Sequence, residues 1–145
     1  MKTSITLASL LLSFSTFAIP YWELECKVDF EGKYQGEAKV KINSNKAKIE
    51  IDFLDTSTPM TETLNASAEN ELTYIAQYED APATVLTVPR NVHNQMRADF
   101  VADRMPIGKR VSFKYGVYGW QVAGEVDFLC VTVPFDVNTP DQDML

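Results

Sequence analysis

Residues 21–30 read YWELECKVDF and give the clearest indication of the fold class. Because successive side chains of a β-strand point to opposite faces, its regular alternation predicts a strand with one buried and one wet face. Residues 120–130, WQVAGEVDFLC, repeat the pattern near the other end of the chain, and Cys130 falls on the apolar face as Cys26 does. The apolar face of the first stretch holds Trp22, Leu24, Cys26, Val28 and Phe30, and its polar face holds Glu23, Glu25, Lys27 and Asp29.

The same period of two recurs through most of the chain. The segment 95–103 fits two structures, since Met96 and Phe100 lie on one face of a strand but, with Val92, also have helical spacing. We predict the strand, because a turn at residues 105–108 leads from it into another alternating run. The eight predicted strands are residues 21–30, 37–42, 47–53, 72–78, 84–88, 95–103, 109–115 and 120–133.

Short strands joined by turns predict an all-β, antiparallel fold in a single domain at residues 19–137. In an eight-stranded up-and-down barrel the first and last strands run antiparallel and can pair, which removes both sheet edges. Cys26 and Cys130 lie on the inner faces of those strands, so we predict a disulfide that links them. A β-sandwich is the alternative, since it also accommodates an inward disulfide between sheets.

The first eighteen residues predict a signal peptide. Lys2 is followed by an apolar run from Ile5 to Phe17, and small residues precede the expected cleavage after Ala18. The run is too short to cross a bilayer, so no membrane insertion is expected after cleavage. The mature protein is expected to be secreted or periplasmic, where two cysteines most simply form one disulfide.

The charge of the chain excludes a nucleic-acid partner. Its 20 acidic and 13 basic side chains give a net charge of -7, whereas a phosphate-binding face needs an excess of lysine and arginine. Residues 138–145 are interpreted as a flexible acidic tail. The oxygen ligands between Asp136 and Asp143 lack the glycine and glutamate of a calcium loop, so neither a metal nor another cofactor is predicted.

No catalytic residues are predicted. His93 is the only histidine, and no nucleophile motif accompanies it. The Cys-x-x-Cys spacing of a redox site is absent.

Two segments depart from the strand pattern. Residues 55–70 predict a long surface loop, or a short helix that starts at Thr58-Pro59 and plugs one barrel end. Residues 115–120, YGVYGW, predict an aromatic hairpin whose Tyr115, Tyr118 and Trp120 are the candidate binding residues. The alternative is that these aromatic rings cap the core.

These features favour an exported, non-catalytic protein-binding module, such as an inhibitor or partner of an envelope or extracellular enzyme. The alternative is a carrier of a small apolar ligand, and an enzyme ranks third. Seven aromatic side chains on the expected inner faces argue against the carrier, because an eight-stranded barrel is just wide enough for side chains to fill. They are Trp22, Phe30, Phe53, Phe100, Phe113, Trp120 and Phe128.

Overall fold

Strand β1 (Trp22–Phe30) pairs on one side with β2 (Lys33–Ile42) and on the other with β8 (Ala123–Val133). The structure is a computed structural model that describes residues 20–80, 82–118, 123–134 and 144. The predicted signal peptide at residues 1–18 lies outside the described residues, as does Trp120.

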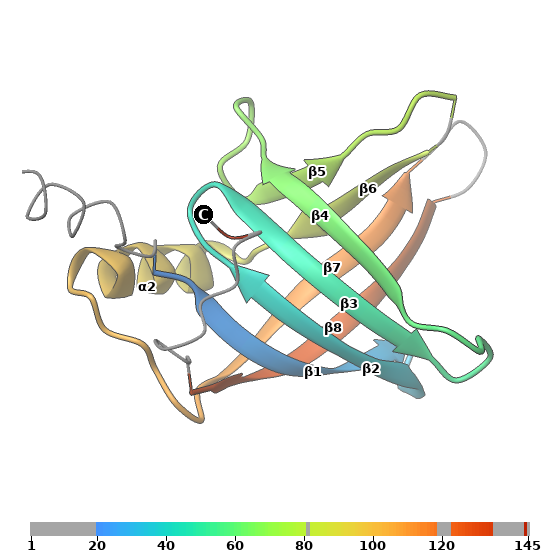
Figure 1. The fold of residues 1–145 in the computed structure, drawn as a ribbon, viewed down its shortest axis with the longest axis horizontal. Coiled ribbons are helices and arrows are strands. Elements are labelled where there is room, and N and C mark those ends of the chain that lie inside the picture. Colours follow the sequence, from blue (N-terminus) through green and yellow to red (C-terminus); the bar gives the residue numbers. More distant parts are fainter. Residues whose placement is uncertain (1–19, 81, 119–122, 135–143, 145) are drawn as a thin grey trace, which may run out of the picture.

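Eight antiparallel strands follow one another in sequence order around a closed barrel (Figure 1). The up-and-down barrel predicted from the sequence is therefore confirmed, and its alternative, the sandwich, does not describe the fold. The remaining strands are β3 (Lys46–Phe53), β4 (Met60–Ala66), β5 (Thr73–Ala76), β6 (Ala83–Thr87) and β7 (Arg110–Tyr118).

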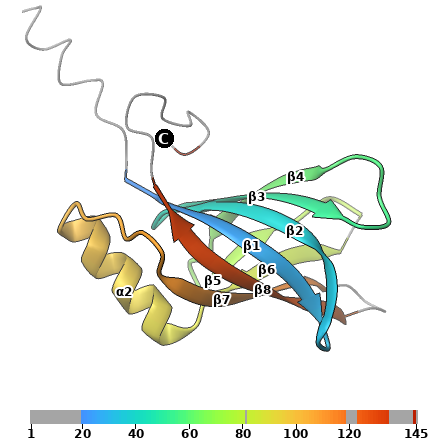
Figure 2. The same cartoon turned by 90° about the horizontal axis from the view of Figure 1, so that it is seen from below.

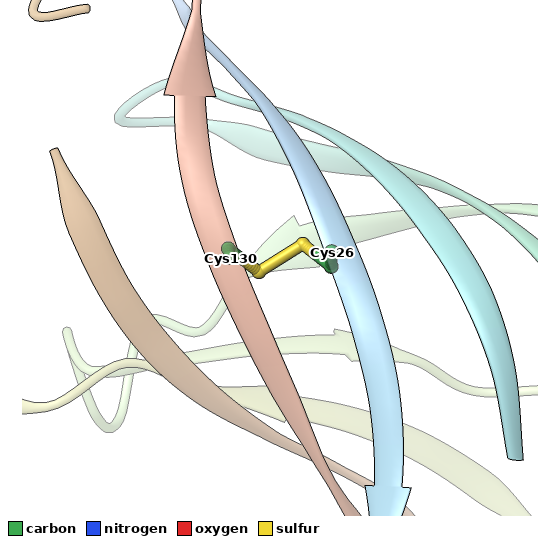
Figure 3. The surroundings of a disulfide bond; sticks show 2 residues. All are labelled: Cys26 and Cys130. Carbon is green, nitrogen blue, oxygen red and sulfur yellow. A yellow bond between two sulfur atoms is a disulfide. The ribbon is translucent and has the colours of Figure 1, made fainter. Parts of the chain in front are cut away.

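A disulfide between Cys26 and Cys130 joins the first and last strands, as predicted (Figure 3). The two residues are direct cross-strand neighbours with a Cα–Cα distance of 4.0 Å, and Val28 lies opposite Phe128 in the same register. The bridge therefore fits the pairing that closes the barrel.

Side chains fill the barrel interior. Trp22, Tyr74, Phe113, Phe128 and Met96 are among the largest fully buried side chains, and aliphatic residues from all the long strands pack around them. Of the other aromatic side chains that we expected inside, Phe53 and Phe100 are partly buried, whereas 43% of Phe30 is exposed.

The predicted strand at residues 95–103 is wrong, because this segment belongs to helix α2 (Arg90–Val101). The helical spacing of Val92, Met96 and Phe100 is the pattern that the fold uses. Val92 and Met96 are buried in the core, and the ring of Phe100 meets that of Trp22 edge-on at 6.5 Å between centroids. Burial of one helical face against the barrel stabilises this segment as a helix rather than a strand.

The loop predicted at residues 55–70 is wrong over its centre, where Met60–Ala66 form strand β4, and the alternative short helix is absent from these residues. Strand β4 pairs with β3 over six residues, from Lys46↔Asn65 to Ile51↔Met60. The predicted number of strands is still correct, since one predicted strand is a helix and one predicted loop is a strand.

The two ends of the barrel differ. Helix α2 lies at the end where β1 begins and β8 ends, which we call the helix end (Figures 1 and 2). Met144 is buried, and its carbonyl oxygen accepts a hydrogen bond of 2.9 Å from Nδ2 of Asn43, in the turn between β2 and β3 at this end. The opposite end, where β1 ends and β2 begins, is the distal end.

Candidate functional site

The structure places Tyr115 inside the barrel, not on its surface. Its side chain is buried, its ring stacks on that of Phe128 at 5.1 Å between centroids, and its hydroxyl donates a hydrogen bond to Glu62. Tyr118 is the last residue of β7 and pairs with Ala83 and Ala123 in the sheet. Tyr118 therefore ends a strand at the distal end, next to residues 119–122, which lie outside the described residues.

Tyr115 is hydrogen-bonded to a carboxylate inside the barrel, that of Glu62. Glu62 lies on the face of β4 that also carries Leu64, and only 8% of its surface is exposed. An apolar residue usually occupies such a position, because a carboxylate without hydrogen-bond partners is costly to bury. Glu62 therefore needs partners inside the barrel.

Hydroxyl groups from three neighbouring segments supply these partners. Oε2 accepts a hydrogen bond of 2.7 Å from the Tyr78 hydroxyl, beyond the end of β5. Oε1 accepts one of 3.2 Å from Tyr115 on β7 and another from Thr84 on β6. All three donors are neutral, so the carboxylate is satisfied without a cation.

The same contacts hold the phenols protonated. The hydrogen bond to Glu62, followed by desolvation, raises the pKa of Tyr78 from 10.0 to about 12. For Tyr115, burial and then the charge of Glu62 raise the pKa above its usual value. Both tyrosines therefore remain donors throughout the physiological pH range.

Exposed apolar side chains lie at the same, distal end of the barrel as this polar group. The topology brings six of them together, because they lie at distal strand ends or in the loops that join them. We call this set the distal rim. Its members are Phe30, Tyr34, Leu54, Met60, Tyr78 and Val117, which are between 37% and 68% exposed.

The distal loops are acidic, whereas the segment at the helix end is basic. Residues 31–33, 54–59 and 77–82 carry the carboxylates of Glu31, Asp55, Glu79 and Asp80 against the single cation of Lys33. Residues 90–110 carry five basic and two acidic side chains. Glu69 and Glu71 of the β4–β5 loop also lie at the helix end, which therefore carries five basic against four acidic side chains, so the distal loops are the more acidic end of the barrel.

A second surface is an open depression of about 1190 Å³ across β7, β8, β1, β2 and β3. Seven of its seventeen lining residues carry a charge, and the register places Glu25 opposite Lys39 and Lys27 opposite Glu37. Opposite charges in facing positions stabilise a sheet. Opposite charges on this surface therefore face one another across β1 and β2.

A third group of polar side chains lies around α2. His93 and Asp99 are buried on the helix, and His93 Nδ1, Asp99 Oδ2 and Trp22 Nε1 are buried without a hydrogen-bond partner. Asp99 Oδ1 accepts a hydrogen bond of 3.0 Å from Gln95. Within the described part of the chain, no group of three histidine, cysteine or acidic side chains could hold a metal ion.

Sequence reasoning missed Glu62, Tyr78 and Thr84 as a group. Glu62 lies in the segment that we interpreted as a loop, and the other two follow or belong to short strands without a distinctive motif. One sequence pattern could have identified Glu62. Met60, Glu62 and Leu64 alternate with polar residues, so Glu62 takes an inward position in a regular strand.

Comparisons with known protein families, with curated proteins and with solved structures find no match to this chain. None of the helices in the described ranges is long and apolar enough to cross a membrane.

Proposed function

We propose that the protein is an exported, non-catalytic protein-binding module that contacts its partner through the distal rim. The observation that carries the proposal is the gathering of six exposed apolar side chains at one barrel end. Apolar patches rimmed by polar residues mark interaction surfaces, and aromatic residues are enriched among their anchors. An inhibitor or partner of an envelope or extracellular enzyme fits this description.

Export is supported by two features. Residues 1–18 have the pattern of a signal peptide, and the Cys26–Cys130 disulfide is compatible with a secreted or periplasmic location. We therefore propose that binding takes place outside the cytoplasm, with a protein that carries basic and apolar side chains.

The filled interior makes the carrier of a small apolar ligand the weaker alternative. Tyr74, Phe113 and Phe128 are fully buried inside the barrel, and Glu62 places a carboxylate in the distal half. An apolar ligand there would lie beside a charged group without giving it a further hydrogen-bond donor.

Two residues of the aromatic hairpin predicted from the sequence lie at the same end of the molecule. Tyr118 ends β7 at the distal end, and Val117 belongs to the distal rim. Tyr118 therefore remains a candidate contact, and Trp120, which lies outside the described residues, stays a candidate on the sequence alone, whereas Tyr115 contacts Glu62 from inside the barrel.

Site-specific photo-cross-linking in the producing cell tests this proposal. A cross-linking amino acid replaces Tyr34 or Met60 in the distal rim or, as a control, Val101, which is 90% exposed on α2. We expect a discrete protein adduct from both rim positions and none from Val101. Equal labelling from all three positions, or no adduct from the rim, would contradict the proposal.

A further inference from the structure

We infer that the distal end receives a lysine side chain of the protein partner, with its ammonium group hydrogen-bonded to Glu62. This inference rests on the proposed function and names the chemistry that the partner brings. Glu62 has neutral donors on both carboxylate oxygens, so a cation can add an electrostatic attraction that its present partners lack.

The carboxylate has room for one more donor. Two carboxylate oxygens offer about four acceptor positions, and three are occupied by hydroxyls. Oε1 holds two of these hydrogen bonds and Oε2 holds one, from Tyr78. Tyr78 is 47% exposed at the rim, so the one donor on the less occupied oxygen comes from a residue that also contacts solvent.

The surroundings strengthen the attraction for a cation. A charge pair inside a barrel is less screened by water than a pair on the surface, and hydrogen bonds between charged groups are stronger than neutral ones. The acidic loops formed by residues 31–33, 54–59 and 77–82 also favour the approach of a basic partner. The negative charge of the distal loops and the buried position of Glu62 therefore both favour a basic side chain.

Lysine fits this site better than arginine. A guanidinium group binds a carboxylate best through two parallel hydrogen bonds to its two oxygens, but Oε1 is already occupied twice. An ammonium group is a compact charge that needs only the free position on Oε2. The apolar stem of lysine can pack along Phe30, Met60 and the other rim residues while its charged end reaches inward.

Peptide binding to the purified, oxidised protein tests the inference. The probe is a short peptide with blocked ends and one lysine between two leucines, and the matched probe carries the same lysine acetylated on Nζ. We expect the wild-type protein to bind the charged probe at least about tenfold more tightly than the neutral one. Calorimetric titration or chemical-shift changes of protein amides would measure both affinities.

Glu62→Gln is the decisive variant, because glutamine keeps the shape and a hydrogen-bond acceptor but removes the charge. We expect it to bind both probes equally, whereas Glu50→Gln, which removes one exposed charge from β3, keeps the preference. A preference that survives in Glu62→Gln would overturn the inference, and so would a wild-type protein without preference. Butylammonium is a further probe, since it carries the same charge without a peptide. If it binds as tightly as the charged peptide, the site binds a free amine, and the assignment to a protein lysine fails.

A second variant keeps the test valid if Glu62→Gln does not fold. Tyr78→Phe retains the aromatic ring but removes the donor on Oε2. We expect its affinity for the charged probe to rise by about threefold or more, since the ammonium then meets an unoccupied oxygen. An unchanged or lower affinity would count against the inference.

The two proposals fail in different ways. If rim cross-linking yields a protein adduct that persists in Glu62→Gln, the protein-binding function stands and the lysine assignment falls. If the rim gives no adduct and Met60→Asp leaves the affinities for both peptide probes unchanged, the distal rim is not the binding surface and both proposals fall.

Discussion

Glu62 places a carboxylate where a small β-barrel usually packs an apolar side chain, and its three donors come from three separate segments of the chain. Tyr78, Thr84 and Tyr115 must all be in position before the carboxylate is satisfied. Buried polar groups destabilise a structure strongly when only part of their hydrogen bonds form. The group therefore favours one specific arrangement of β4, β6 and β7 in addition to any role in binding.

The tyrosines of this group predict a loss of stability at high pH. The pKa of Tyr78 rises from 10.0 to about 12 in the folded protein, so the folded state keeps its proton while the unfolded chain loses it. The resulting stabilisation is present below about pH 10 and disappears as the pH rises through about 12. We expect the difference in urea midpoint between the wild type and Tyr78→Phe to shrink over this range.

Tyrosinate absorbance in the same samples would report the ionisation directly. Tyr74, whose pKa burial raises to about 12, donates its hydroxyl hydrogen bond to the Asn43 carbonyl oxygen at the helix end and provides an internal reference. A Tyr78→Phe difference that stays constant from pH 10 to pH 12 would show that the link between Tyr78 and Glu62 does not contribute to stability.

At the scale of elements, the two errors of sequence interpretation have different physical causes. Strand β4 alternates as a strand should, but Thr and Asn on its outer face and Glu62 on its inner face hide the pattern. Helix α2 lacks the usual signals at its start, since Pro89 occupies the N-cap position without a side-chain hydrogen bond and no acidic residue lies in the first turn. Local sequence could not show that another part of the chain would satisfy Glu62 or bury α2. In contrast, regular alternation identified β1, β3 and β8.

The packing of α2 predicts a pair of contrasting variants. Met96 is fully buried against the barrel, so Met96→Ala should lower the free energy of unfolding by about 2 to 5 kcal/mol. Arg97 is the next residue and is exposed, and its nearest ionic partner, Glu71, lies 3.9 Å away. Arg97→Ala should therefore change stability by no more than about 0.5 kcal/mol.

Urea unfolding followed by circular dichroism compares the two variants. Equal and small effects would mean that α2 covers the helix end without contributing to the core. Equal and large effects would mean that the substitutions act through the helix itself rather than through the buried contact of Met96.

At the scale of the whole molecule, closure of the barrel depends on two kinds of link between the ends of the chain. Strands β1 and β8 pair over seven residues, from Glu23↔Val133 to Asp29↔Asp127, and the disulfide joins residues that are 104 positions apart. The hydrogen bonds act in the folded state, whereas the disulfide mainly restricts the unfolded chain. Period two and the positions of the cysteines favoured this closure, because both are properties of β1 and β8 themselves, but a sandwich also accommodates the disulfide, so the pairing of β1 with β8 was needed to separate the two folds.

The different actions of the two links lead to a prediction about reduction. Freshly purified protein should take up no alkylating label without reductant, because Cys26 and Cys130 are joined. After reduction, the free energy of unfolding should fall by about 2 to 5 kcal/mol, while slow hydrogen exchange along β1 and β8 shows that the strands remain paired. Wild-type protein with and without reductant is the cleanest comparison, since no atoms are removed from the core, and Cys26→Ala with Cys130→Ala provides the permanent form. Rapid exchange of both strands under conditions in which the other strands stay protected would mean that the bridge, and not the sheet, closes the barrel.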